Sequence, residues 1–274
     1  MLSDVKFPYP EARRGQLELA ESIAEVVKSG GSIVVRAPTG YGKTVSVVYG
    51  LLLGGARRVI YTVRTINEMD PVLRELKLFD VDYSILVSAR RTCPVMVKPG
   101  SPPLPHEDFW RNCAILRARG LCSYYRRALE KAGEIWGYAR RYPLPRALRL
   151  LRDIAKVYEA CPFFAMLLLA ESATFIVATY PYVFREDIAG EVLGGNLGDY
   201  VLVVDEAHSL INAQSIVERR VTLGDLARAA GEIRRYSPEN SQIAGALEGV
   251  VEELGRHAKR RWSGLKAIDK NIVL

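Results

Sequence analysis

Long apolar runs, a leader segment and closely paired cysteines are all missing from this chain of 274 residues. Its apolar stretches are far shorter than the ~20 residues that a membrane helix needs, so we expect no membrane association. The charged residues Asp4 and Lys6 stand where a secretion signal would have its apolar segment. We therefore expect an intracellular protein, cytoplasmic or, in a eukaryote, nuclear. In such a compartment the 4 cysteines serve as thiols or metal ligands rather than as disulfides.

Positive charge is concentrated in one part of the chain. Residues 89–160 hold 15 lysines and arginines against 6 aspartates and glutamates, whereas the whole chain has a net charge of +7. The same segment contains the aromatic residues Phe109, Trp110, Tyr124, Tyr125, Trp136 and Tyr138. Basic side chains contact phosphates and aromatic rings stack on bases, so this mixture favours single-stranded nucleic acid as a partner. A solvated charged face without a partner is the alternative.

A glycine-rich stretch, "APTGYGKT" at residues 37–44, stands between an apolar stretch and a helical one. The sequence "SIVVR" at residues 32–36 is short, apolar and β-branched, which predicts a buried strand. The chain from Lys43 to Leu53 predicts a helix, which the two glycines at 54 and 55 would end. The glycine-rich stretch would therefore join a strand to the N-terminus of a helix.

A loop in that position is suited to binding phosphate. Free N–H groups and the helix dipole attract an anion, and Gly40 and Gly42 let phosphate oxygens approach the backbone. Lys43 would reach the β- and γ-phosphates of a nucleotide, and the Thr44 hydroxyl would ligate Mg²⁺. The sequence differs from the pattern G-x-x-x-x-G-K-[ST] because Ala37 replaces the first glycine. The alternative is a plain glycine turn before a helix.

A second apolar stretch, "YVLVVDEAH" at residues 200–208, ends in two carboxylates and a histidine. In a parallel α/β sheet, ligands bind beyond the carboxyl ends of the strands. Asp205 would then hold Mg²⁺ through water, and Glu206 would orient and deprotonate the water that attacks the γ-phosphate. The same residues after a strand could also be a simple helix cap.

Together the two motifs resemble those of superfamily 2 helicases of the DEAH type. The sequence "RRGQ" at residues 13–16 is similar to the adenine-reading Q motif of these enzymes. The sequence "YTVRTINE" at 61–68 resembles motif Ia, which touches the DNA backbone, and "ATYPYVF" at 178–184 resembles a stretch typical of archaeal XPD. The resemblance therefore narrows to the XPD-like helicases and gives a weak indication of archaeal origin.

The four cysteines add to this resemblance. Cys93, Cys113, Cys122 and Cys161 all lie between the motif Ia-like stretch and the DEAH motif. XPD-like helicases carry there an insert whose four cysteines ligate a [4Fe–4S] cluster, and four thiolates are the usual ligands of such a cluster. The spacing alone does not choose the metal, so a zinc site and free thiols stay open. We expect a loop-rich insert that depends on a structural cluster for its order.

The resemblance implies a full set of site residues. Catalysis would rest on Lys43, Asp205 and Glu206. The nucleotide would be bound by Arg13, Gln16, Pro38, Thr39, Gly40, Tyr41, Gly42, Lys43, Thr44 and His208. Mg²⁺ would be held by Thr44 and Asp205, and the cluster by Cys93, Cys113, Cys122 and Cys161. DNA would be contacted by Arg64, Thr65, Tyr180, Arg90, Arg91 and Arg111.

The predicted fold is α/β, a RecA-like P-loop domain with a mainly parallel sheet. Strands are expected near residues 32–36, 58–63, 83–88, 175–179 and 200–204. The motor domain would comprise residues 1–88 and 162–214, the four-cysteine insert 89–161, and the helical start of an arch domain 215–274. In this last part Thr222 and Asp225 predict a capping box, and Ser237 and Pro238 predict an N-cap and first helical residue. Apolar residues then recur at helical spacing, at Ile243, Leu247, Val250, Val251 and Leu254.

The implied function is that of an ATP-dependent DNA helicase of the XPD type, working 5′-to-3′ on single-stranded DNA in repair. Its cofactors would be ATP, Mg²⁺ and the [4Fe–4S] cluster. The family has two motor domains, and this chain has room for one. We therefore expect nucleotide and DNA binding without autonomous unwinding, with a second motor domain or repair-complex proteins as partners. Two other classes stay open: a P-loop ATPase that does not act on nucleic acid, and a non-catalytic DNA-binding module.

Overall fold

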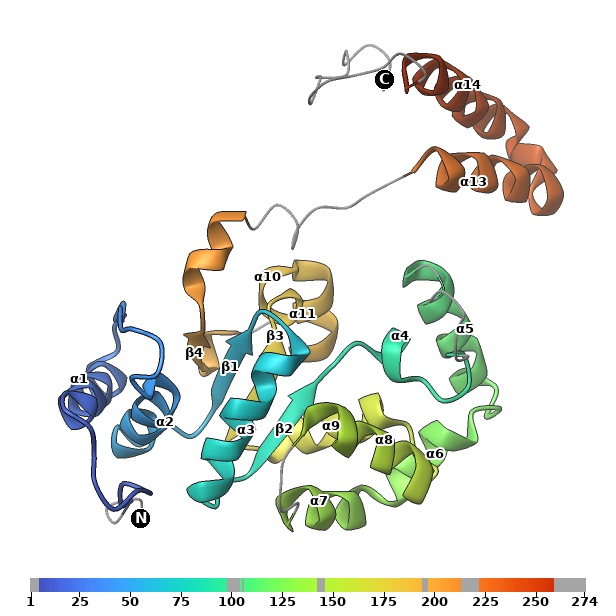
Figure 1. The fold of residues 1–274 in the computed structure, drawn as a ribbon. Coiled ribbons are helices and arrows are strands. Elements are labelled where there is room, and N and C mark those ends of the chain that lie inside the picture. The colour runs from blue at the N-terminus through green and yellow to red at the C-terminus, as the bar shows by residue number, and fades with distance from the viewer. Residues whose placement is uncertain are drawn as a thin grey trace. The chain divides into compact units, whose positions relative to one another are not determined.

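The structure is a computed structural model that describes residues 5–97, 104, 106–141, 146–193, 197–212 and 222–258. The chain divides into two compact units, Met1–Val217 and Glu218–Leu274 (Figure 1). The first unit holds a sheet with helices around it, and the second is a pair of helices. No helix in the described ranges is long and apolar enough to cross a membrane.

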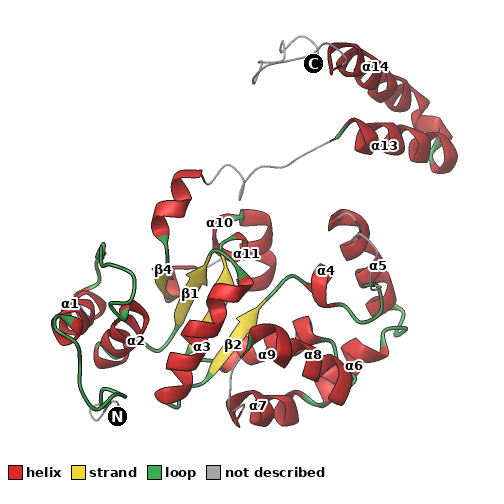
Figure 2. Ribbon diagram, viewed as in Figure 1, coloured by secondary structure: helices red, strands yellow, loops and turns green. Residues whose placement is uncertain are grey.

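The sheet of the first unit has four parallel strands in the order β2-β3-β1-β4 (Figure 2). The strands are β1 (Val59–Val63), β2 (Tyr83–Leu86), β3 (Phe175–Thr179) and β4 (Val201–Val204). Strands β1 and β2 are buried throughout, as expected for apolar, β-branched strands that helices cover on both faces. Four of the five predicted strands are therefore confirmed, together with the α/β fold class.

The strand predicted at residues 32–36 is wrong. These residues have no regular secondary structure, and the side chains of Ile33 and Val34 are 41% and 97% exposed. A strand needs a neighbouring backbone to accept and donate its hydrogen bonds, and the described residues place none beside this segment. Apolar, β-branched composition therefore did not suffice to form a strand here.

Helices cover the sheet and precede or follow its strands. They are α1 (Gln16–Ser29), α2 (Lys43–Leu53), α3 (Met69–Leu78), α9 (Pro162–Ser172), α10 (Pro181–Phe184) and α11 (Glu186–Leu193). Short 3₁₀ helices are η1 (Ile66–Glu68), η2 (Leu197–Asp199) and η3 (Ala207–Asn212). Helix α2 has the predicted bounds. It packs so closely on α1 that a Cβ at Gly50 would lie 2.6 Å from the carbonyl oxygen of Ala20.

The cysteine segment is helical, which corrects the expectation of a loop-rich insert. It contains α4 (Ala89–Thr92), α5 (His106–Ala118), α6 (Ser123–Glu130), α7 (Ala132–Arg141) and α8 (Ala147–Val157). Helix α8 buries Leu150, Leu151 and Ile154 and packs on α3 and α9. These three residues recur at helical spacing and give α8 one apolar face. The insert therefore buries apolar surface of its own.

The second unit is a pair of packed helices, α13 (Leu223–Tyr236) and α14 (Ser241–Ala258), joined by η4 (Pro238–Asn240). The predicted capping box is present, since the Asp225 amide donates to Thr222 Oγ1 at 3.1 Å and the Thr222 amide donates to Asp225 Oδ2 at 3.0 Å. Ser237 and Pro238 start η4 rather than the long helix, and Ser237 makes no side-chain capping bond. The assignment of this unit to an arch domain, and the predicted domain boundaries, stay predictions.

Candidate nucleotide and metal sites

The glycine-rich loop reaches the N-terminus of α2 through two positions whose backbone conformation favours glycine. Gly40 and Gly42 have φ values of 82° and 90°, in the left-handed region. A Cβ at Gly42 would also collide with the side-chain amide of Gln16, whereas a Cβ at Gly40 would meet no heavy atom within 4 Å. The sequence thus places its glycines where the backbone turns into the helix, as the phosphate-loop prediction requires.

The side chains of Arg13 and Gln16 donate hydrogen bonds to the backbone of this loop. The Gln16 side chain is 4% exposed, and its amide donates to the Tyr41 carbonyl oxygen at 2.9 Å. Its Oε1 accepts from the Arg13 amide at 2.8 Å, and the Arg13 guanidinium donates to the Gly40 carbonyl oxygen. Both residues therefore brace the loop backbone in this structure. Their predicted contact with adenine stays a prediction.

The structure brings the loop lysine to the carboxylate that follows β4. Lys43 Nζ lies 3.6 Å from Glu206 Oε1 and donates to the Ala37 carbonyl oxygen at 3.3 Å. Glu206 Oε2 lies 3.2 Å from His208 Nδ1, and the His208 side chain is 73% exposed. Three residues predicted from two motifs, about 160 positions apart in the chain, thus meet at one place.

A buried tyrosine that sequence reasoning missed lies at the same place. The hydroxyl of Tyr61, in the middle of β1, is 3.5 Å from Asp205 Oδ2 and is hydrogen-bonded to the Thr44 side chain. Tyr61 is 2% exposed, and its burial raises the pKa of its hydroxyl. It therefore stands between the two predicted Mg²⁺ ligands. A tyrosine inside an apolar strand was the available signal, since a buried hydroxyl needs a partner.

The surroundings of Asp205 disfavour the charged form of its carboxyl group. Burial raises the pKa of the Asp205 carboxyl, and the carboxylates of Glu206 and Glu68 raise it further. The Glu206 amide, which donates to Asp205 Oδ1 at 3.0 Å, and the Lys43 ammonium lower it. A half-buried group of carboxylates with one lysine is an arrangement that a divalent cation would stabilise.

The side chain of Tyr180 is buried in this structure, and its predicted contact with DNA stays a prediction. Its side chain is 1% exposed, and its hydroxyl donates to the backbone carbonyl oxygens of Asp205 and, at 3.1 Å, Glu206. Its ring packs edge-on against Phe184. The residue lies at the end of β3 and faces the turn after β4, because parallel strands end at the same edge of the sheet.

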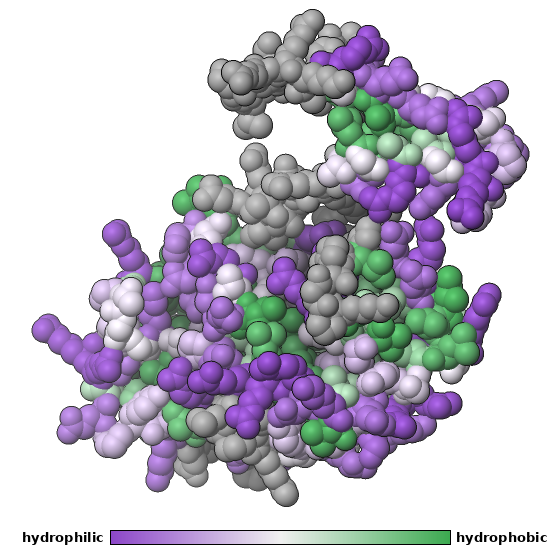
Figure 3. All heavy atoms as spheres, turned by 45° about the vertical axis from the view of Figure 1, so that its right-hand side comes forward, coloured by the Kyte–Doolittle hydropathy of each residue, from purple (hydrophilic) through white to green (hydrophobic). Residues whose placement is uncertain are grey.

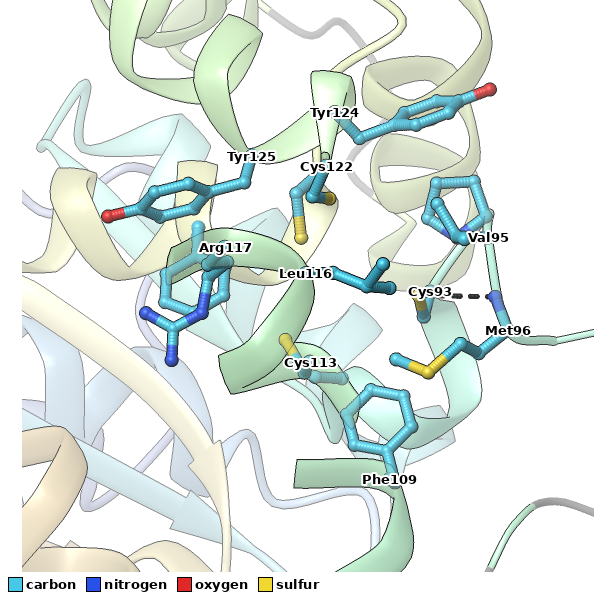
Figure 4. A pocket seen from close by; sticks show the side chains of 14 residues that line it. Cys93, Val95, Met96, Phe109, Cys113, Leu116, Arg117, Cys122, Tyr124 and Tyr125 are labelled. Atoms are coloured by element: carbon cyan, nitrogen blue, oxygen red, sulfur yellow. Dashed lines mark hydrogen bonds between the residues drawn. The ribbon is translucent and has the colours of Figure 1, made fainter. Parts of the chain in front are cut away.

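The four cysteines line one pocket, together with apolar side chains and Arg117 (Figure 4). Each sits at or near a helix end or on a helix of the insert: Cys93 after α4, Cys113 in α5, Cys122 before α6 and Cys161 before α9. Among described residues, no three His, Cys, Asp or Glu side chains form a group that could hold one metal ion. The four thiols share one cavity, which is lined largely by apolar side chains.

Buried thiols and an arginine determine the electrostatics of this pocket. Burial raises the pKa of Cys161 to about 12, although amides at the start of α9 lower it. Burial also raises the pKa of Cys113, which the Arg117 guanidinium lowers. Arg117 stacks on the rings of Tyr125 and Phe164, and its Nε is buried without a hydrogen-bond partner among the described residues. The pocket therefore has thiol donors and one cation ready to balance negative charge.

The predicted DNA contacts other than Tyr180 lie on the surface. Arg64 is 58% exposed in its side chain and pairs with Glu68 at 3.2 Å, while Thr65 begins η1 with a capping box. Arg91 and Arg111 are exposed and Arg90 is half-buried. No ion pair of these last three arginines occurs among described residues.

Much of the remaining basic segment is already paired. Arg126, Arg127, Lys131 and Arg140 form ion pairs with Glu130, Glu159, Glu134 and Asp82. Phe109 is 1% exposed, and Trp110, Tyr124, Trp136 and Tyr138 pack on the core. Figure 3 shows apolar patches within a mostly hydrophilic surface. The alternation of basic and aromatic residues therefore serves packing to a large extent, rather than base stacking.

Comparison with known proteins gives the family. The DEAD_2 profile matches residues 61–223, more than half of the chain. The chain belongs to the DEAD_2 family. The match begins in β1 with Tyr61 and includes the cysteine pocket and the turn after β4, whereas the phosphate loop at residues 37–44 precedes it.

Among curated DEAD_2 relatives, a helicase subunit XPD of the general transcription and DNA repair factor IIH from Arabidopsis thaliana is 28% identical over 264 residues, covering 84% of this chain and 34% of its own length. An ATP-dependent DNA helicase XPD from Sulfolobus acidocaldarius is 27% identical over 250 residues, covering 88% and 40%. The chain thus spans about a third to two-fifths of these relatives and corresponds to a portion of an XPD-like superfamily 2 helicase. The relatives come from plants, fungi and archaea, so they do not support an archaeal origin in particular.

Solved structures support the DEAD_2 fold. A structure named truncated XPD has a TM-score of 0.61 and 23% identity, covering 86% of this chain and 65% of that one. A structure named XPD helicase has a TM-score of 0.62 and 21% identity, covering 97% and 45%. At this level of identity the likeness concerns the fold.

Proposed function

We propose that this chain is the nucleotide- and DNA-binding portion of an XPD-type ATP-dependent DNA helicase that acts 5′-to-3′ on single-stranded DNA in repair. The observation that carries the proposal is the approach of Lys43 Nζ to Glu206 Oε1 at 3.6 Å. It brings the phosphate loop and the DEAH turn together across the end of the sheet. The protein would work in the cytoplasm, or in the nucleus of a eukaryote.

The residues of the phosphate loop and the DEAH turn would each bind a different part of Mg·ATP. The amides at the start of α2 and the Lys43 ammonium bind phosphate oxygens, with residues 38–42 around them. Thr44 and Asp205 would hold Mg²⁺, which would neutralise charge on the phosphates when bound. Glu206, freed from Lys43 by the incoming phosphates, accepts a proton from the attacking water. Arg13, Gln16 and His208 complete the nucleotide site.

Replacing the loop lysine tests this proposal. We expect Lys43→Ala to weaken Mg·ATP binding at least tenfold, because the ammonium interacts with two phosphates, while the circular dichroism spectrum stays unchanged. Isothermal titration calorimetry measures the affinity. Lys28→Ala, which removes an exposed lysine of α1, is the matched control and should bind as the parent does. Equal ATP affinity of Lys43→Ala and the parent would overturn the proposal.

Hydrolysis and unwinding require more than this site. In the family, an arginine of a second motor domain stabilises the transferring phosphoryl group, and such a finger contributes about 10³–10⁵ in rate. We therefore expect the isolated chain to bind ATP and to hydrolyse it slowly. A second motor domain, or proteins of a repair complex, would supply the missing groups.

The cysteine pocket fits a [4Fe–4S] cluster in its donors. Cys93, Cys113, Cys122 and Cys161 line one cavity with apolar walls, and half-buried Arg117 supplies a positive charge there. When bound, a cluster of this type links four thiolates and joins the helices that carry them. A broad absorption band near 400 nm and about four irons per chain are expected for protein purified without oxygen. If metal analysis finds one zinc and no iron per chain, the pocket is a zinc site instead.

Single-stranded DNA would bind along the surface that carries Arg64, Thr65, Arg90, Arg91 and Arg111. Contacts to phosphates release counterions, so the affinity should fall steeply with salt and depend little on base sequence. We expect the double variant Arg90→Ala/Arg91→Ala to bind a labelled oligonucleotide several-fold more weakly and with a shallower salt dependence.

The matched control for DNA binding is Arg126→Ala/Arg127→Ala, which removes two arginines that are already paired with Glu130 and Glu159. Fluorescence anisotropy in a salt series measures all three proteins. A flat salt dependence of the parent would favour a P-loop ATPase that does not act on nucleic acid. Binding of DNA without any binding of ATP would favour the non-catalytic module.

A further inference from the structure

The backbone of Glu206 has a conformation that requires an explanation. Its φ is 52°, in the left-handed region that residues with a Cβ rarely adopt. Such a conformation persists where surrounding contacts hold it, and these contacts tend to be found at functional sites. Here the residue is the carboxylate that faces Lys43 and His208. Something must hold its backbone in place.

Tyr180 makes the contacts that hold this turn. Its hydroxyl proton is shared between the carbonyl oxygens of Asp205 and Glu206, which flank the α-carbon of Glu206. The side chain is 1% exposed, so the hydroxyl has no access to bulk water as an alternative partner. The Glu206 carbonyl oxygen also accepts from the Ser209 amide at 2.9 Å, so the Asp205 carbonyl oxygen depends more on the Tyr180 hydroxyl.

The other end of Tyr180 is tied to β1. Its backbone amide donates to the Val63 carbonyl oxygen at 3.1 Å, and Val63 directly precedes Arg64. Charged groups that face the Tyr180 hydroxyl are Glu68, Asp205, Glu206 and Arg64, so both the 61–68 stretch and the DEAH turn contribute to its surroundings. One buried side chain thus contacts both the strand that presents Arg64 and the turn that presents the carboxylates.

We propose that Tyr180 is a positioning residue that holds the Asp205–Glu206 turn in its left-handed conformation and couples it to the end of β1. This inference rests on the proposed function, because the turn matters as the Mg²⁺ and water side of the nucleotide site. In this role Tyr180 need not contact the nucleotide. It acts through the two carbonyl oxygens and fixes where the carboxylates point.

The test removes one oxygen atom and keeps the ring. Tyr180→Phe is compared with Tyr182→Phe, the same change at a tyrosine two residues away that is 5% exposed. We expect Tyr180→Phe, but not Tyr182→Phe, to speed amide hydrogen exchange in residues 205–209 without changing exchange in β1 and β3. Equal exchange in parent and Tyr180→Phe, or faster exchange throughout the sheet, would overturn the proposal.

A second measurement compares ATP affinity with and without Mg²⁺. With Mg²⁺ present, Tyr180→Phe should bind ATP about tenfold more weakly, the size of effect expected from a lost buried hydrogen bond. With EDTA it should bind as the parent does, because the loop and Lys43 are untouched. Equal loss with and without Mg²⁺ would contradict a role at this turn. If the parent binds no ATP at all, the proposed function fails, and the exchange experiment still decides the inference.

A double-variant cycle separates positioning from general stabilisation. Glycine adopts positive φ without strain, so Glu206→Gly should make the turn less dependent on its support. The loss of melting temperature caused by Tyr180→Phe should therefore be smaller in the Glu206→Gly background than in the parent. The same loss in both backgrounds would mean that Tyr180 contributes only to packing.

Discussion

Asp205 is held in a position that suits a bound cation better than the free protein. Burial and two neighbouring carboxylates raise its pKa, although the Glu206 amide and Lys43 favour its charged form. A carboxyl group with a raised folded-state pKa contributes stability below its ordinary pKa and loses it as the pH rises through the folded value. At neutral pH the ionised side chain therefore destabilises the free protein.

We accordingly expect Asp205→Asn to raise the melting temperature slightly at pH 7 in the absence of Mg²⁺, and the gain to shrink as the pH is lowered toward 4. Differential scanning calorimetry at both pH values checks the sign. The same variant should lose the increase in ATP affinity that Mg²⁺ gives the parent. Glu21→Gln, which neutralises an exposed carboxylate of α1, is the control. A lower melting temperature at pH 7 would contradict this account of the turn.

At the scale of residues, the sequence predicts the groups whose type defines a motif. Lys43, Asp205, Glu206 and His208 could be placed because the pattern of a phosphate loop and of a strand end dictates them. Tyr61 and Tyr180 could not, since their roles depend on which backbone or carboxylate their hydroxyls meet across the sheet. That depends on strand order, which local sequence does not contain.

At the scale of elements, the packing of α2 on α1 decides where the phosphate loop sits. A Cβ at Gly50 would lie 2.6 Å from the Ala20 carbonyl oxygen and 2.8 Å from Ile23 Cβ. The helix begins at Lys43, so a shift of α2 away from α1 moves the loop as well.

We expect Gly50→Ala to destabilise the protein by about 1–3 kcal/mol, the usual cost of overpacking, and to weaken ATP binding. Urea unfolding and calorimetry measure the two effects. Gly137→Ala, in α7, is the matched control, because a Cβ there meets no heavy atom within 4 Å and alanine favours a helix by up to about 1 kcal/mol. If both variants unfold at the same urea concentration, the close contact does not limit this packing.

Elements with a strong local pattern were predictable, and those that depend on a distant partner were not. Helix α2 and strands β1, β2, β3 and β4 follow from apolar runs between glycines and polar turns. Residues 32–36 have the composition of a strand but lack a neighbouring strand among the described residues. The insert differs in the opposite direction, because its many charges hide the apolar stripe that makes α8 a packed helix.

At the scale of the whole molecule, the cysteines connect helices α4, α5, α6 and α9 around one cavity, in a part of the chain distinct from the phosphate loop. We expect Cys113→Ser to lose most of its iron, to make the insert more sensitive to proteases and to weaken DNA binding several-fold. ATP affinity should change little. Because the insert also packs through α8, its helical content should largely remain.

The control for this experiment is Ala114→Ser, which places the same hydroxyl at an exposed neighbour on α5. Iron analysis, limited proteolysis, anisotropy and calorimetry are run on the parent and both variants. A Cys113→Ser protein that has lost its iron, yet resists proteolysis and binds DNA as the parent does, would show that the cluster is not a structural staple.

Strand β4 has consequences for how the protein behaves in solution. It pairs with β1 on one side, no described residue pairs with its other side, and Leu202 on it is 42% exposed. Val34 lies 97% exposed in another segment of β-branched residues. An unpaired row of backbone donors and acceptors is a template for edge-to-edge association with a second molecule. Concentrated samples should therefore scatter light increasingly with time. The association that causes this scattering would begin at an edge of the sheet of folded molecules rather than in an unfolded core.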